Sequence, residues 1–271
     1  RQVGLKVNAV HRGGDPATSL DLVILGDGYT ADELPKFRRD AARFATVLLG
    51  VEPFAARRNA INVWSVESPS RESGVDEPRK GIFRDTALSL SFNTLDSPRY
   101  LMTTDTRAVH DVAANAPYDA ILILSNTSRY GGGGIYGLYS SAVADNAYDE
   151  YVFVHEFGHS LAGLGDEYFT SSVAYNEMYP RGVEPWEPNL TAARRRVQVK
   201  WRALIDGATP VPTPPGTGLA PGRAGLFEGA GYSAKGLFRP AADCKMFDKG
   251  QTPFCPVCRR TLDATLDRFT K

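Results

Sequence analysis

Residues 149–168 read DEYVFVHEFGHSLAGLGDEY and include two of the four histidines of the chain. His155 and His159 flank Glu156 in the pattern His-Glu-x-x-His. Residues four apart lie about one helical turn, or ~6 Å, apart on one helix face, so both imidazoles can bind one metal ion. With this content of His and Glu, the pattern arises by chance roughly 0.003 times in such a sequence. The motif therefore predicts a zinc site in which Glu156 reaches the metal-bound water.

The motif lies within an apolar helical pattern. Residues 151–154 form a hydrophobic run before it, and Leu161 extends the buried face four residues after Phe157. This spacing predicts a buried helix over residues 149–162. The alternative is an ordinary packed helix whose histidines are hydrogen-bonded core residues, but the low chance frequency of the motif and its place on an apolar helix favour zinc.

A catalytic zinc usually has three protein ligands, so a third residue has to be found after the motif. In a continuous helix, Asp166 would lie about 10.5 Å beyond His159 along the axis, too far to share one ion. Gly163 and Gly165 are suited to end the helix and turn the chain back. Asp166 is the first choice and Glu167 the second, because spacing alone does not separate adjacent carboxylates. Either residue can instead be a plain surface acid.

Outside the motif, the first half of the chain alternates strand and helix patterns. Strands are predicted at residues 20–25, 61–67 and 118–124, and helices at residues 31–49, where Thr30 and Glu33 can form a capping box, and 106–116. This order indicates an α/β domain. The later part is rich in Pro and Gly, with helices expected at residues 190–204 and 256–269. We expect one domain over residues 1–271, with an α/β subdomain at about 1–165 and an irregular lobe at about 166–271.

Composition excludes several classes of protein. The 271 residues are 42% hydrophobic and 23% charged, and 31 basic residues balance 31 acidic ones. With no net charge, the chain lacks the field that attracts nucleic acid. No apolar run approaches the ~20 residues of a transmembrane helix. The sequence begins at Arg1 and shows no signal peptide, which we interpret as a processed or truncated product without its targeting segment.

Three cysteines lie near the C-terminal end: Cys244, Cys255 and Cys258. A disulfide from Cys244 to the Cys-Pro-Val-Cys segment would tie this region to the last helix. Thiol redox chemistry is disfavoured, since no thioredoxin-like strand pattern surrounds the pair. A structural zinc would need a fourth ligand, and the nearby sequence shows none.

The string at residues 155–168 closely resembles the IgA-specific metalloendopeptidase family of zinc peptidases. It is also similar to the metzincin signature lengthened by one residue, because Gly163 is four and Asp166 seven positions after His159, and Asp stands where that signature has His. Further similar segments occur in the family's order, at residues 24–30, 62–64, 70–74, 125–126, 130–134, 244–246 and 254–258.

The resemblance implies a metzincin-like zincin fold, with a mixed twisted sheet and a C-terminal lobe that carries a Met-turn. Residues 130–141 would then be a glycine-rich edge strand that binds an extended peptide, unless they form a flexible loop. The expected substrate-binding residues are Gly133, Gly134, Ile135 and Tyr136. Met246 would be the Met-turn residue, although a single Met is also common as core filling.

The expected activity is endoproteolysis by a Zn²⁺ enzyme. His155, His159 and Asp166 would hold the metal, and Glu156 would take a proton from water and pass it to the leaving amine. A tyrosine would assist the reaction, but spacing does not choose between Tyr168, Tyr136 and Tyr139.

The expected partner is a polypeptide in extended conformation. A secreted, periplasmic or cell-surface location is expected, since an unblocked metallopeptidase site favours export. The rival hypotheses are a catalytically silent zincin-fold binding module and a metal-dependent amidohydrolase. Substrate identity and oligomeric state stay open.

Overall fold

The structure is a computed structural model that describes residues 4–170, 178–180, 182–250 and 252–270. The chain divides into two compact units. One contains residues 1–161 and 266–271, and the other contains residues 162–265.

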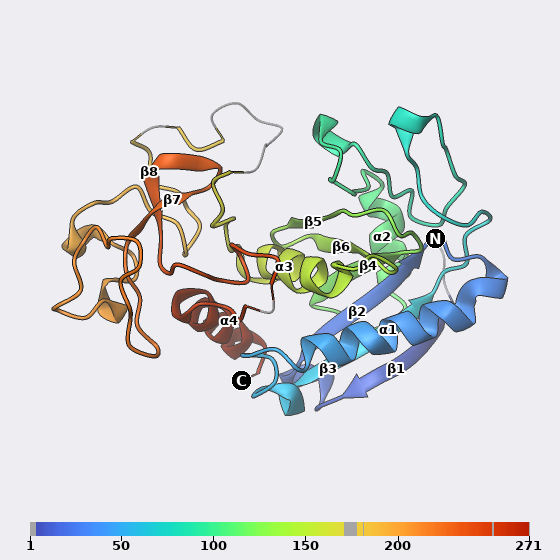
Figure 1. The fold of residues 1–271 in the computed structure, drawn as a ribbon. Coiled ribbons are helices and arrows are strands. Elements are labelled where there is room, and N and C mark those ends of the chain that lie inside the picture. Colours follow the sequence, from blue (N-terminus) through green and yellow to red (C-terminus); the bar gives the residue numbers. More distant parts are fainter. Residues whose placement is uncertain (1–3, 171–177, 181, 251, 271) are drawn as a thin grey trace. The chain divides into compact units, whose positions relative to one another are not determined.

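The first unit is built on a six-stranded sheet with the strand order β1-β3-β2-β4-β6-β5 (Figure 1). The four inner strands β3, β2, β4 and β6 run parallel, and β1 and β5 pair antiparallel at the two edges. The predicted mixed α/β sheet is thus confirmed. The strands are β1 (Lys6–Arg12), β2 (Leu20–Asp27), β3 (Ile61–Glu67), β4 (Ala120–Ser125), β5 (Gly132–Ile135) and β6 (Tyr139–Val143).

Helices α1 (Leu34–Leu48) and α3 (Asp149–Ala162) share one face of this sheet (Figure 1). Their contact is aromatic, since the rings of Phe44 and Phe153 lie 5.2 Å apart. The predicted capping box is present, because the Thr30 N–H donates to the Glu33 carboxylate at 2.9 Å. It opens a short 3-10 turn, Ala31–Glu33, so the α-helix begins three residues later than predicted.

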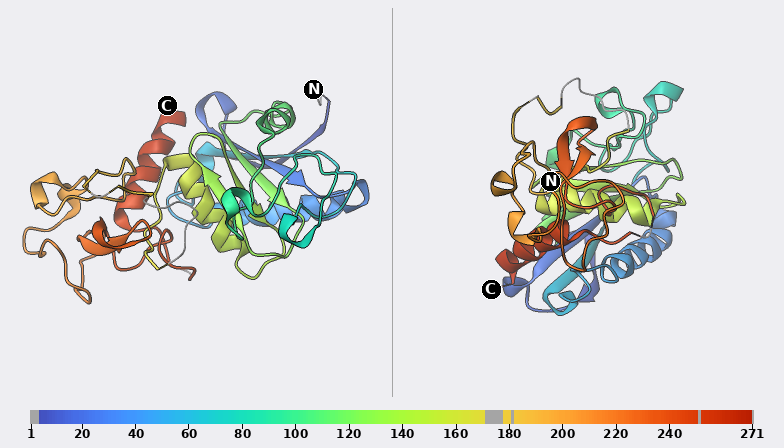
Figure 2. Two further views of the ribbon diagram at one scale, coloured as in Figure 1. Left: turned by 90° about the horizontal axis from the view of Figure 1, so that it is seen from above. Right: turned by 60° about the vertical axis from the view of Figure 1, so that its left-hand side comes forward.

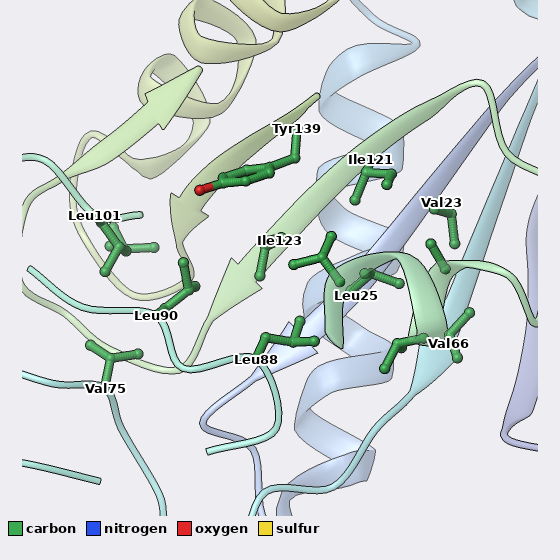
Figure 3. Close-up of a cluster of buried hydrophobic side chains, with 14 of the residues drawn as sticks. Val23, Leu25, Val66, Val75, Leu88, Leu90, Leu101, Ile121, Ile123 and Tyr139 are labelled. Carbon is green, nitrogen blue, oxygen red and sulfur yellow. The ribbon is translucent and has the colours of Figure 1, made fainter. Parts of the chain in front are cut away.

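The other face is covered by α2 (Thr106–Ala113) and by irregular chain between residues 75 and 101. Figure 3 shows side chains of β2 and β4, such as Leu25 and Ile123, directed towards Leu88 and Leu90. Asp27 at the end of β2 fixes this irregular chain, because its carboxylate accepts the N–H groups of Leu88 at 2.8 Å and Leu90 at 2.9 Å. Burial raises the pKa of Asp27 to about 6 despite these bonds.

The second unit contains a hairpin of β7 (Phe227–Ala230) and β8 (Ser233–Arg239) and most of α4 (Pro256–Phe269), joined by long irregular stretches (Figure 2). The helix predicted at residues 190–204 is wrong. Thr191 pairs with Phe238 beside the hairpin, and the Lys200 ammonium donates to the Leu190 carbonyl at 2.8 Å. A continuous helix over these residues is incompatible with both contacts, and the segment has only two 3-10 turns, Arg196–Gln198 and Arg202–Leu204.

Among the described residues, none of the helices combines the length and apolar character that crossing a membrane requires.

Candidate metal centre

Helix α3 places the two motif histidines as the sequence predicts. The Nε2 atoms of His155 and His159 lie 3.1 Å apart, and their rings are nearly perpendicular at 84°. Two nitrogen ligands at about 2.0–2.1 Å from one ion, at a tetrahedral angle, would be about 3.3 Å apart. The pair therefore fits a shared zinc ion through Nε2 of each ring. His155 is buried and His159 is half-buried.

Glu156 completes the cluster that the described residues form on this helix. One ligand atom each from His155, Glu156 and His159 lie within 4.8 Å of one another. The remaining two histidines have partners outside this cluster: His11 contacts the Arg58 carbonyl, and His110 contacts the Tyr118 hydroxyl.

Tyr151, one turn before His155, was not singled out from the sequence. Its hydroxyl lies 3.1 Å from Nδ1 of His155. A proton on Nδ1 can be donated to this oxygen, which leaves Nε2 free to bind a metal and fixes the ring. The signal was available, because a tyrosine four residues before a histidine shares its helix face.

Strand β5 lies directly against α3 (Figure 1), and its glycines explain how. A Cβ on Gly134 would stand 2.4 Å from the Glu156 carbonyl oxygen and 2.8 Å from the Cβ of His159. A Cβ on Gly132 would stand 2.6 Å from a methyl group of Val152. Gly133 faces the other way, towards Met102. Glycine is thus required at alternate positions because the strand backbone touches the motif helix.

The glycine-rich edge strand expected at residues 130–141 is present but shorter. Only Gly132–Ile135 forms the edge, whereas Tyr139–Val143 is the inner strand β6, which pairs with both β4 and β5. Gly133, Gly134 and Ile135 belong to the edge strand, and Tyr136 follows it with 52% of its surface exposed.

The outer edge of β5 is already occupied at its first residue. The Gly132 N–H donates to the Arg99 carbonyl at 3.1 Å, and the Leu101 N–H donates to the Gly132 carbonyl at 3.2 Å. Backbone groups of alternate residues point to the same edge of a strand, so Gly134 is the next residue directed outwards.

Gly163 ends the motif helix in the left-handed conformation, with φ +62°, as predicted. Gly165 has a different function from the one predicted. Its N–H and carbonyl bond the Asn189 side-chain amide at 2.7 and 2.9 Å, and a Cβ there would stand 2.6 Å from Leu190. It is a position of close approach rather than a turn.

Asp166 belongs to the second unit and is buried there. Its carboxylate accepts a hydrogen bond from the Tyr232 hydroxyl, and its carbonyl accepts the Gly231 N–H at 2.9 Å. Tyr232 contacts the hydroxyl of Tyr168 at 3.3 Å in turn.

Glu167 has different surroundings. Its fully buried side chain accepts a hydrogen bond from Asn189 at 3.0 Å and lies 3.1 Å from the sulfur of Cys258. Burial raises the pKa of this carboxyl well above its ordinary value. The two adjacent carboxylates, which spacing did not separate, therefore have separate partners.

Met246 is fully buried in a turn that the Phe247 N–H closes on the Cys244 carbonyl at 2.9 Å. Its own carbonyl accepts the Glu167 N–H, also at 2.9 Å. The turn is thus bonded to the chain segment that carries both carboxylates.

Of the three tyrosines named from the sequence, Tyr139 is part of the hydrophobic core. It is buried, and its hydroxyl donates to the Thr103 carbonyl at 2.7 Å and accepts the Thr103 N–H at 3.0 Å.

Comparison with known proteins identifies one family. A family profile described as IgA peptidase M64 matches residues 9–218 and 216–266. No curated protein matches the chain.

Proposed function

Because the chain belongs to the IgA peptidase M64 family, and is therefore a peptidase of a metallopeptidase family with a polypeptide substrate, we propose that it is a zinc-dependent endopeptidase. In this proposal His155, His159 and Asp166 hold the metal and Glu156 is the general base. The family matches reach into both compact units, which supports one catalytic domain made of the two.

The observation that carries the proposal is the 3.1 Å separation of the two histidine Nε2 atoms with Glu156 beside them. When bound, zinc supplies the Lewis acid that polarises the scissile carbonyl and acidifies water. Glu156 accepts the proton of the attacking water and delivers it to the leaving amine. Tyr151 holds the His155 ring through Nδ1.

Asp166 is the preferred third ligand because Glu167 already faces the cysteines. The hydrogen bond from Tyr232 would orient the Asp166 carboxylate, as outer partners of metal ligands commonly do. We propose that Met246 is the Met-turn residue. Its support is the backbone bond between its turn and residue 167.

The substrate would add to the sheet beside β5. Gly134 offers the first outward backbone groups beyond those used by residues 99–101, and its backbone touches α3 at Glu156 and His159. A peptide paired there in extended conformation would run past the motif helix. Ile135 and the exposed Tyr136 would contact its side chains, and Tyr136 or Tyr168 would be the assisting tyrosine.

Removal and return of metal test the proposal. Cleavage of a peptide library should cease after treatment with a zinc chelator and return on adding zinc but not magnesium. Unchanged cleavage by the metal-free protein would refute it.

A further inference from the structure

We propose that the three cysteines and Glu167 form a second metal site, which takes a thiophilic divalent cation such as zinc and has a structural function. One ligand atom each from Cys244, Cys255, Cys258 and Glu167 lie within 4.8 Å of one another, and all four side chains are buried. This site lies wholly within the second unit.

The distances are close to those of tetrahedral coordination. Two thiolates at about 2.3 Å from one zinc ion lie about 3.8 Å apart, and a thiolate and a carboxylate oxygen lie about 3.6 Å apart. The sulfurs of Cys244 and Cys258 are 3.7 Å apart. Oε1 of Glu167 lies 3.8 Å from the sulfur of Cys255 and 3.1 Å from that of Cys258, the second distance being shorter than the tetrahedral one.

The backbone is arranged to support thiolates. Cys255 immediately precedes helix α4 and Cys258 lies in its first turn. The Cys255 N–H points to the sulfur of Cys244 at 3.3 Å, and the Cys258 N–H points to the sulfur of Cys255 at 3.5 Å. Helix N-termini and N–H donors stabilise a thiolate over a thiol, and thiolates are the form that binds zinc.

Glu167 carries the second, independent observation. Its Oε2 atom is buried and has no hydrogen-bond partner among the described residues, whereas Oε1 is bonded by Asn189. A buried carboxylate oxygen without a partner is costly. Oε1 is also the oxygen near the sulfurs, so a cation bound by both oxygens of this carboxylate and by the three sulfurs would remove that cost.

The sequence did not reveal this site because its fourth ligand is remote. Glu167 lies in the motif region, while the cysteines lie near the C-terminal end. All three cysteines are free. A disulfide between any two of them would leave the third sulfur and the Glu167 carboxylate with no common group to bind.

The site would join three chain segments: residues 166–168, the turn at Met246 and the start of α4. The Glu167 N–H bond to the Met246 carbonyl connects the first two directly. Insofar as Asp166 is a zinc ligand, which rests on the proposed function, a metal at Glu167 would hold the neighbouring ligand in place.

Cobalt loading of the full chain tests the site. The chain has only three cysteines, all in this cluster, so a sulfur-to-cobalt charge-transfer band can arise only here. We expect this band in the wild type and in the double variant His155→Ala, His159→Ala. Metal analysis should give about two ions per chain for the wild type and about one for the histidine variant. The double variant Cys244→Ser, Cys258→Ser should lose about one ion and the band.

If the cysteine variant does not fold, the charge-transfer band of the cobalt-loaded wild type and a titration of its thiols decide whether the site exists. Protected thiols that become reactive after chelation support the site. Absence of the band, with thiols that react freely or are oxidised to a disulfide in the metal-loaded protein, overturns it. Failure of the catalytic proposal is distinguishable, because the histidine variant would then bind as much metal as the wild type while the band persists.

Discussion

Gly134 and His159 lie so close that a Cβ on the glycine would stand 2.8 Å from the Cβ of the histidine. The edge strand and helix α3 therefore touch through backbone, with no side chain between them on the strand side. In the proposed mode of substrate binding, this contact sets how near a peptide added to the strand can come to the histidine pair.

Gly134→Ala should separate strand from helix. The new methyl group would meet the Glu156 carbonyl oxygen at 2.4 Å, and backbone cannot move aside cheaply. We expect a loss of about 1–3 kcal/mol in unfolding free energy, together with most of the activity. The matched variant Gly133→Ala meets the flexible end of Met102 and should cost less than about 1 kcal/mol. Equal unfolding free energies for the two variants would contradict the contact.

Tyr151→Phe should weaken metal binding without unfolding the chain. Loss of the hydroxyl at His155 Nδ1 leaves the ring without this hydrogen bond. Because removing such a partner of a metal ligand typically lowers metal affinity about 10–100-fold, we expect a drop of about that size in zinc affinity. Competition with a chelating dye measures it. Tyr148→Phe, at an exposed tyrosine just before the helix, is the control and should bind zinc like the wild type.

Asp166→Asn should abolish peptide cleavage and lower zinc affinity, because a neutral amide is a poor substitute for a carboxylate ligand. Asp243→Asn, at an exposed acid of the same unit, should leave both unchanged. An Asp166→Asn variant that retains full affinity and cleavage would remove Asp166 from the ligand set.

We expect the unfolding free energy of the chain to depend on pH because of the buried carboxyl group of Asp27. Its pKa is raised from 3.8 to about 6 by burial, so the folded chain binds this proton more tightly than the unfolded chain does. The resulting stabilisation is complete below about pH 4 and is lost as the pH rises through about 6, and it amounts to about 3 kcal/mol.

Asp27→Asn cannot titrate and isolates this effect. The unfolding free energy of the wild type minus that of the variant should fall between pH 4 and pH 7 in denaturant titrations. A constant difference across this range would show that Asp27 does not titrate there. The part of the free-energy difference that does not change with pH reports the altered bonds to Leu88 and Leu90.

The sequence predicted elements with strong local signals and missed those set by distant contacts. Strand β3 and helices α3 and α4 begin and end where their apolar periodicity predicts. Strand β1 was missed because an edge strand has no continuous buried run, and all its residues are exposed or half-buried. The helix expected at residues 190–204 failed because Thr191 pairs with Phe238.

The same division holds for the candidate site. The histidine pair and Glu156 follow from helical spacing, and the glycine that ends the helix follows from its conformational freedom. The different surroundings of Asp166 and Glu167 depend on Tyr232 and on cysteines far along the chain, and no local pattern records them.

The most direct test of the central claim compares the intact protein with Glu156→Gln, by metal analysis and by cleavage of a peptide library. We predict that both bind the same amount of zinc and that the variant cleaves at least about 100-fold more slowly, since the base is lost while the histidine ligands remain. Zinc binding with equal cleavage by both proteins would contradict the proposed general base, and an intact protein that binds no metal would contradict the account as a whole.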